Sequence, residues 1–172
     1  MAQADQGVTV SHNRYQGIPR VLIFLRHGRD VLLLKGAPNK RIWANLYNGV
    51  GGHVEANEDI LSAARREVIE ETGLTVTDLH LQAVVNVDAG TPGVGILMSV
   101  FTGWTAERQT TSSVEGSLHW VPVSQLDQLA LVEDLHWLLP QLMTRPLTDP
   151  PLFLHYSYDD QDKLVIRQAP TG

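Results

Sequence analysis

Residues 51–74 read GGHVEANEDILSAARREVIEETGL, a paired glycine followed by a segment crowded with carboxylates. The segment predicts one helix over residues 58–72, with Asn57 as its N-cap and Gly73 at the position of a C-cap glycine. Acids in the first turn suit the positive end of the helix dipole. Apolar side chains recur at helical spacing and direct one stripe toward a core: Leu61, Ala64 and Val68.

Three acids of this helix are expected to share one face. Glu67, Glu70 and Glu71 stand at i, i+3 and i+4, where each like-charge pair costs an exposed helix about 0.2–0.5 kcal/mol. Arg66 can pair with Glu70, but not with all three acids. A hard divalent cation would turn the repulsion into attraction, because Mg²⁺ prefers carboxylate oxygens and binds beside substrate phosphates. The alternative is a solvated acidic face without a ligand.

Length and composition indicate one folded domain. Of the 172 residues 43% are hydrophobic and 19% charged, which is enough for a core and too little charge for a disordered chain. The formal charge of −6 argues against a nucleic-acid polymer or a membrane surface as partner, since both require a basic patch. A polyanionic small molecule remains compatible if metal ions supply positive charge.

Several classes of site are excluded or disfavoured. The chain has no cysteine, which excludes disulfides, thiolate zinc sites and cysteine nucleophiles. Its histidines are scattered singly, which disfavours a zinc site. No apolar run reaches membrane-spanning length and the first residues lack signal-peptide regions, so a cytoplasmic protein is expected. The oligomeric state stays open between monomer and homodimer.

Outside the acidic helix the chain alternates between strand-like and helix-like segments. A hairpin is expected over residues 19–35, and a second one near the end over residues 152–168. The other expected strands cover residues 79–87, 95–104 and 118–123. Two further segments, 123–129 and 133–143, look helical, although Pro140 should kink or end the second. This order predicts a mixed sheet between helices.

The spacing of the acidic segment is specific. It matches the pattern G-x5-E-x7-R-E-U-x-E-E-x-G-U, where U is a bulky apolar residue, at every fixed position. The matching residues are Gly52, Glu58, Arg66, Glu67, Val68, Glu70, Glu71, Gly73 and Leu74. The chain thus resembles the Nudix hydrolase family, whose signature this box is. The resemblance implies an α/β (α+β) fold, an α/β/α sandwich around a mixed sheet, formed by a single domain over residues 19–169 after a polar tail at 1–18.

The resemblance also implies roles for the box. Nudix proteins hydrolyse a nucleoside diphosphate linked to a further group, with Mg²⁺ or Mn²⁺ as cofactor. Glu70 and Glu71 would be the principal metal ligands, and Glu67 a ligand or the general base. The carbonyl of Gly51 would add an oxygen ligand. Residues that hold this catalytic cluster in place, rather than touch the substrate, would be Arg66, Glu58, Gly52 and Gly73.

Segments outside the box resemble the oxidised-purine nucleoside triphosphatases of the family. The segment LYNGVGGHVE resembles the start of their box, and EGSLHW places Glu115 where they carry a downstream metal-binding carboxylate. The resemblance further implies that Asn48, Glu133 and Asp134 contact the base. Alternatives remain for each: a turn role for the asparagine, and a helix N-terminus for the acids. Lys35 could contact phosphates or be a solvated surface charge.

The sequence therefore predicts a Mg²⁺-dependent nucleotide pyrophosphohydrolase. Its expected substrate is a purine nucleoside triphosphate, oxidised purines included, cleaved to a monophosphate and pyrophosphate. One alternative keeps the chemistry but changes the substrate to a dinucleotide or ADP-ribose. Another is a Nudix-like domain that binds a nucleotide as a sensor without cleaving it, which the complete set of carboxylates disfavours.

Overall fold

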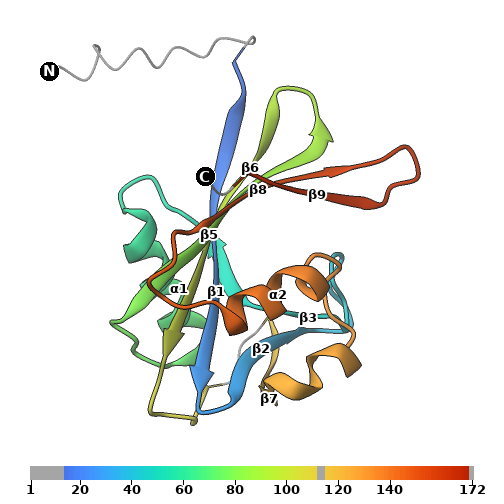
Figure 1. The fold of residues 1–172 in the computed structure, drawn as a ribbon. Coiled ribbons are helices and arrows are strands. Elements are labelled where there is room, and N and C mark those ends of the chain that lie inside the picture. Colours follow the sequence, from blue (N-terminus) through green and yellow to red (C-terminus); the bar gives the residue numbers. More distant parts are fainter. Residues whose placement is uncertain (1–13, 112–114, 171–172) are drawn as a thin grey trace, which may run out of the picture.

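The structure, a computed structural model, describes residues 14–111 and 115–170 (Figure 1). Its strands are β1 Gln16–His27, β2 Asp30–Gly36, β3 Tyr47–Asn48, β4 Val50–His53, β5 Leu79–Thr91, β6 Val94–Trp104, β7 Gly116–Pro122, β8 Leu152–Tyr158 and β9 Leu164–Gln168. Its helices are α1 Ile60–Thr72, the 3₁₀ helix η2 Val123–Gln128 and α2 Leu135–Thr144. The two predicted hairpins correspond to β1–β2 and β8–β9.

Within the described residues, nine strands form one mixed sheet in the order β3-β2-β1-β6-β5-β8-β9, with β4 paired to β1 and β7 to β2. Two pairs, β1 with β6 and β5 with β8, are parallel. Antiparallel pairs include β1 with β4 and β5 with β6. The pairing of β4 with β1 matters for function, because it fixes the paired glycines against the centre of the sheet.

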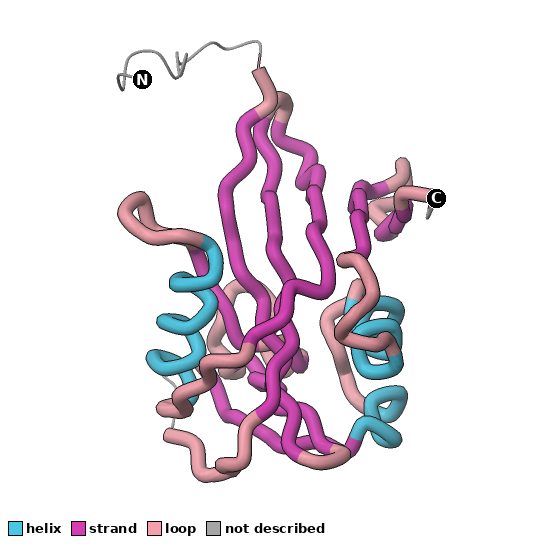
Figure 2. Tube along the Cα trace, turned by 60° about the vertical axis from the view of Figure 1, so that its left-hand side comes forward, coloured by secondary structure: helices cyan, strands magenta, loops and turns pink. Residues whose placement is uncertain are grey.

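The two α-helices lie on opposite faces of the sheet, as Figure 2 shows from the side. Alternate residues of β1 enter two separate cores, Val21 and Ile23 with α1, and Leu22 and Phe24 with α2. Both faces of this strand are therefore buried, which explains why its sequence is a continuous apolar run rather than an alternating one. The α/β/α sandwich confirms the predicted fold class.

Helix α1 begins two residues later than predicted. Its N-cap is Asp59 and not Asn57: the Oδ1 atom of Asp59 accepts hydrogen bonds of 2.9 Å from each of two first-turn amides. Asn57 lies in the turn that precedes the helix. Gly73 ends the helix in the left-handed conformation, with φ 73°, as the sequence predicts.

The second half contains both predicted helical segments. Residues 123–128 form the 3₁₀ helix η2. Pro140 lies inside α2, so of the two outcomes predicted for it, the helix does not end there. A proline removes one helix hydrogen bond, but this helix buries four leucines against the sheet, and that burial holds its last turn in place.

The predicted tail, residues 1–18, only partly falls within the described residues. β1 begins at Gln16, so the last three residues of that span belong to the sheet, while residues 1–13 lie outside the described part. Among the described helices, none combines the length and the apolar content needed to cross a membrane.

Candidate active site

Two of the three acids on α1 point into the protein. Glu67 and Glu71, one helical turn apart, are 9% and 8% exposed. The Oε2 atom of Glu71 accepts a hydrogen bond of 3.1 Å from the backbone amide of Gly51 on β4. Glu70 lies at the edge of this face and is largely exposed. The helix thus presents its carboxylates to the paired glycines of β4.

The paired glycines leave the space that this approach requires. A Cβ atom on Gly52 would lie 2.2 Å from Oε1 of Glu67, and a Cβ on Gly51 would lie 2.1 Å from the carbonyl oxygen of Val21. Both distances are far below van der Waals contact. Only glycine at these two positions lets β4 pair closely with β1 and lets a carboxylate lie against its backbone.

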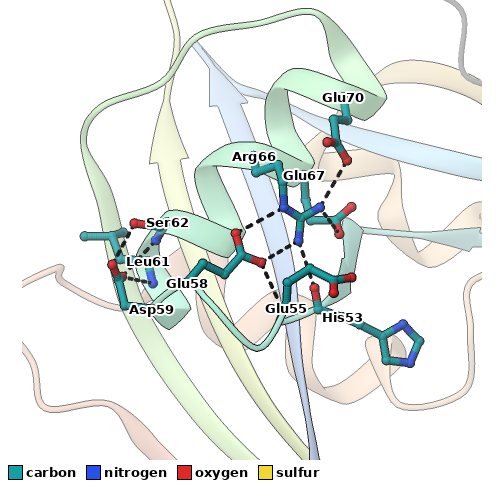
Figure 3. A network of polar contacts seen from close by, with 9 residues as sticks. All are labelled: His53, Glu55, Glu58, Asp59, Leu61, Ser62, Arg66, Glu67 and Glu70. Carbon is teal, nitrogen blue, oxygen red and sulfur yellow. Dashed lines mark hydrogen bonds and ion pairs between the residues drawn. The ribbon is translucent and has the colours of Figure 1, made fainter.

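Arg66 organises the acids from the exposed side of the helix (Figure 3). Its guanidinium donates to both carboxylate oxygens of Glu58, at 2.7 and 3.1 Å. It also donates to Glu67 at 2.9 Å and to Glu70 at 3.0 Å. A further bond of 2.9 Å reaches the carbonyl of His53 at the end of β4. One arginine therefore ties together the loop before α1, the helix and the strand, while Glu71 is left outside this network.

Glu71 lies in an environment that disfavours its negative charge. Burial, and then the charges of Glu115 and Glu67, raise the pKa of Glu71 to about 7. The effect of Glu115 shows that the segment before β7 brings a third carboxylate close to those of α1. Glu115 also forms an ion pair with Lys40. A local excess of negative charge thus gathers at the junction of α1, β4 and this segment.

These donors fit a hard divalent cation. All are oxygens: the carboxylates of Glu67, Glu70, Glu71 and Glu115, and the carbonyl of Gly51. Oxygen ligands of this kind suit Mg²⁺. Among the described residues, no three acidic or histidine side chains converge into a ready-made cage. Arg66, bound to both Glu67 and Glu70, takes up part of their charge in this structure.

A pocket opens beside the acids. Its walls include Asn48, Gly51, Glu71 and Glu115, together with Lys40. Trp43, in the loop between β2 and β3, adds an aromatic wall and has a left-handed backbone, with φ 62°. The pocket therefore joins carboxylates to an amide, a cation and an aromatic ring, groups that suit phosphates and a base.

The residues predicted to contact the base and phosphates lie in different settings. Asn48 lines the pocket, and its Oδ1 atom accepts a hydrogen bond of 2.8 Å from the amide of Gly49, which also fits a turn role. Glu133 is exposed, and its carboxylate accepts a long bond of 3.4 Å from the amide of Leu164 on β9. Lys35 lies over the ring of Tyr47, with Nζ 5.5 Å from the ring centroid, rather than in the pocket wall.

Asp134 is the N-cap residue of α2 and is half-buried. Burial raises the pKa of Asp134 to about 6, an effect that nearby backbone amides partly offset and the charge of Glu133 increases. The loop that carries Asp134 is bound to β3. The amide of Tyr47 donates to the carbonyl of Ala130 at 2.8 Å, and the amide of Val132 donates to the carbonyl of Tyr47 at 3.0 Å. This places Asp134 on the element that borders the strand of Asn48.

Replacing Asp134 with asparagine should reduce the pH dependence of stability. Since the folded-state pKa of about 6 exceeds the unfolded value, the folded protein binds more protons between about pH 4 and 6, and its free energy of unfolding falls as pH rises through that window. The free energy of unfolding of the asparagine variant minus that of the wild type should therefore be about 2 kcal/mol larger at pH 7.5 than at pH 4.5. Urea unfolding at both pH values measures this. Asp160→Asn, at an exposed turn position, is the control, and equal gains in both variants would contradict the prediction.

The sequence offers Lys40, like Lys35 and Arg41, as a phosphate contact or a solvated surface charge, and Trp43 as a core or pocket-wall residue, but it does not indicate Tyr156. Lys40 was only one of several cations before the box, and its pairing with Glu115 joins residues 75 positions apart. Trp43 reaches the pocket through an unusual loop backbone that no local pattern predicts. Tyr156 lies in the closing hairpin, where no local pattern marks it as part of a site.

Comparison with known proteins places this site in a family. A family model described as NUDIX domain matches residues 17–142. The chain belongs to the Nudix family. The oxidized purine nucleoside triphosphate hydrolase of Mus musculus is 27% identical over 145 residues, which cover 84% of this chain and 88% of the mouse protein. The family resemblance inferred from the box, including its oxidised-purine branch, is confirmed.

Solved structures show the same fold. The crystal structure of the mutator MutT protein from Bacillus halodurans has a TM-score of 0.75 at 23% identity and covers 90% of this chain and 99% of that one. The NUDIX domain of NrtR from Shewanella oneidensis, solved with ADP ribose, has a TM-score of 0.63 at 18% identity and covers 83% and 97%. This chain is therefore a Nudix hydrolase, an enzyme acting on pyrophosphate bonds, and Nudix hydrolases generally use divalent metal ions.

Proposed function

We propose that this Nudix hydrolase converts a purine nucleoside triphosphate, oxidised purines included, to the monophosphate and pyrophosphate with Mg²⁺ or Mn²⁺. The pocket carries this proposal, because Asn48 lies in its wall with Glu71 and Glu115. An amide suits a purine edge since it both donates and accepts hydrogen bonds. Carboxylates suit the metal ions that accompany a triphosphate. The activity named for the mouse relative supports the same substrate class.

In this proposal, some residues of the site bind the metal ions and others hold the metal-binding carboxylates in position. The oxygen ligands are Glu70, Glu71, Gly51 through its carbonyl, and Glu115. Glu67 either completes this set or accepts the proton of the attacking water. Bound metal ions supply positive charge against the phosphate oxygens and make the water more acidic. Arg66, through its bonds to Glu58, Glu67 and Glu70, holds the carboxylates where the ions and the water need them.

The reaction needs little covalent chemistry from the chain. The oxygen of water attacks an inner phosphorus, the bridging P–O bond breaks, and pyrophosphate leaves with the bonding electron pair. The proton of the water passes to Glu67 or to solvent. Lys40, which lines the pocket and pairs with Glu115, is placed to meet the phosphate chain when the nucleotide enters. Catalysis would come mainly from positioning and charge neutralisation.

A second substrate class remains open. The related NUDIX domain from Shewanella oneidensis was solved with ADP ribose, and ADP-ribose or a dinucleotide offers the same pyrophosphate bond. A non-catalytic nucleotide sensor fits less well, because it has no need for all the carboxylates of the box. In each case the partner is a small nucleotide. The cytoplasmic location and the choice between monomer and homodimer stay predictions.

A hydrolysis screen with Mg²⁺ tests the proposal. Ordinary and oxidised purine triphosphates, pyrimidine triphosphates, a dinucleoside polyphosphate and ADP-ribose are compared by kcat/KM and by product identity. Purine triphosphates should give the highest kcat/KM, with the monophosphate and pyrophosphate as products. A higher kcat/KM for ADP-ribose, with AMP and ribose phosphate as products, would favour the second class. Asp134→Ala should mainly alter the ranking among bases, and an unchanged ranking would remove Asp134 from base recognition.

A further inference from the structure

The hydroxyl group of Tyr156 is buried but forms no hydrogen bond within the described residues. Tyr156 lies on β8, between Val87 of β5 and Ile166 of β9, and only 3% of the residue is exposed. Its ring packs in the core on the α2 side of the sheet. Its Oη atom is buried and has no hydrogen-bond partner among the described residues. A buried tyrosine hydroxyl normally has a partner, because leaving it unpaired is unfavourable.

The charge of Asp134 acts on this hydroxyl. Burial, and then the charge of Asp134, raise the pKa of Tyr156. The apolar residues that flank Asp134 in the chain, Val132 and Leu135, belong to the same core cluster as the tyrosine ring. The unpaired hydroxyl of Tyr156 thus belongs to the same core as the residues that flank the half-buried carboxyl of Asp134.

Phenylalanine would fill this apolar position equally well without an unpaired hydroxyl. The hydroxyl is therefore unexplained by packing, and the carboxyl whose charge acts on it belongs to a residue proposed to contact the base. We propose that Tyr156 is a positioning residue for base recognition: when a purine binds, Oη of Tyr156 donates a hydrogen bond to the Asp134 carboxylate and fixes the oxygen that accepts from the base. This inference rests on the proposed function, in which Asp134 contacts the base.

The inference names the kind of base that is favoured. A hydrogen bond from a hydroxyl stabilises the ionised form of a carboxyl group. An ionised carboxylate only accepts hydrogen bonds, so it suits a purine edge that presents a ring N–H and an amino group, as guanine-type bases do. Adenine-type bases present a ring-nitrogen acceptor at the same place and would need a protonated carboxyl. Tyr156 thus biases the site toward guanine-type purines.

Tyr156→Phe tests this, because it removes only the hydroxyl. Steady-state kinetics with guanine-type and adenine-type triphosphates are measured for the wild type, Tyr156→Phe, Asp134→Asn and the double variant. In Tyr156→Phe the KM for guanine-type substrates should rise about tenfold while kcat changes less than about twofold, since a hydrogen bond to a charged group is lost in binding. The KM for adenine-type substrates should change little. In the Asp134→Asn background the effect should disappear.

Stability separates a positioning role from a structural one. Since the hydroxyl has no hydrogen-bond partner within residues 14–111 and 115–170, the thermal unfolding midpoint of Tyr156→Phe should equal or exceed that of the wild type. Tyr158→Phe is the matched control, because Tyr158 also senses the charge of Asp134 but is half exposed. Its KM should change less than about twofold.

Three results would overturn the inference: an unchanged KM for Tyr156→Phe, the same change in the Asp134→Asn background, or a lower kcat together with a lower unfolding midpoint. In all three the wild type still hydrolyses purine triphosphates, so the proposed function stands. A wild type that hydrolyses no purine triphosphate would overturn the proposed function, and the inference with it.

Discussion

Replacing Glu71 with glutamine is expected to lower kcat by about 10³-fold and to leave the protein folded. Glu71 is the acid of α1 that lines the pocket, beside Gly51 and close to Glu115. Glutamine keeps the shape of the side chain, and its carbonyl oxygen can still accept the hydrogen bond from the amide of Gly51. It brings no negative charge to hold a divalent cation. The loss should therefore appear in the chemical step rather than in folding.

The same variant should have a higher free energy of unfolding than the wild type, although its kcat is lower. Burial and neighbouring charges raise the pKa of Glu71 to about 7, so between about pH 4 and 7 the folded protein binds more protons than the unfolded chain. The free energy of unfolding thus falls as pH rises through this window. Without a metal ion at pH 8, the glutamine variant should be more stable than wild type by on the order of 1–2 kcal/mol.

Kinetics with Mg²⁺ and urea unfolding at pH 5 and pH 8 measure both effects. Mg²⁺ should raise the unfolding midpoint of the wild type more than that of the variant, because an ion that binds only the folded state stabilises it. Glu107→Gln, at an exposed position, is the matched control for the loss of one charge. A Glu71→Gln enzyme that keeps more than about a tenth of the wild-type kcat would remove Glu71 from the metal site.

The parts of the molecule that follow from local rules could be predicted from the sequence. The helix over the box, its C-cap at Gly73 and the two hairpins all depend on residues close together in the chain. The N-cap was misplaced by two residues because Asn57 and Asp59 are both good capping residues, and only the entry angle of the loop decides between them. The family could be assigned from the box pattern because that pattern is also local: it consists of residue spacings along one loop and one helix.

The parts that depend on distant contacts could not be predicted. Lys40 meets Glu115 because the sheet order brings β7 beside β2, and Tyr156 joins the core beneath α2 because that order brings the closing hairpin beside β5. The burial of Glu67 and Glu71, against the exposure of Glu70, also depends on how α1 sits on β4. Helical spacing alone puts the three acids on one face and does not distinguish them.

Replacing Arg66 with alanine is expected to reduce the free energy of unfolding by about 2–3 kcal/mol and kcat by about 10²-fold. The guanidinium of Arg66 is the shared partner of Glu58, Glu67 and Glu70, and these carboxylates raise its pKa further above the usual value. Without it, Glu67 stays nearly buried beside Glu71 and loses the guanidinium with which it pairs at 2.9 Å. Its carboxylate would then move from the position against Gly52, and displacement of a catalytic group by about 1 Å can cost 10²-fold in rate.

Lysine at this position gives a sharper test than alanine. It keeps the positive charge but not the planar fork of donors that binds Glu58 with two bonds and reaches the carbonyl of His53. Arg66→Lys should therefore recover most of the stability and little of kcat. Arg65→Ala is the matched control, because Arg65 precedes it on the helix and makes one hydrogen bond, to the carbonyl of Thr77. If the lysine variant regains both quantities together, Arg66 acts only through its charge and does not position Glu67.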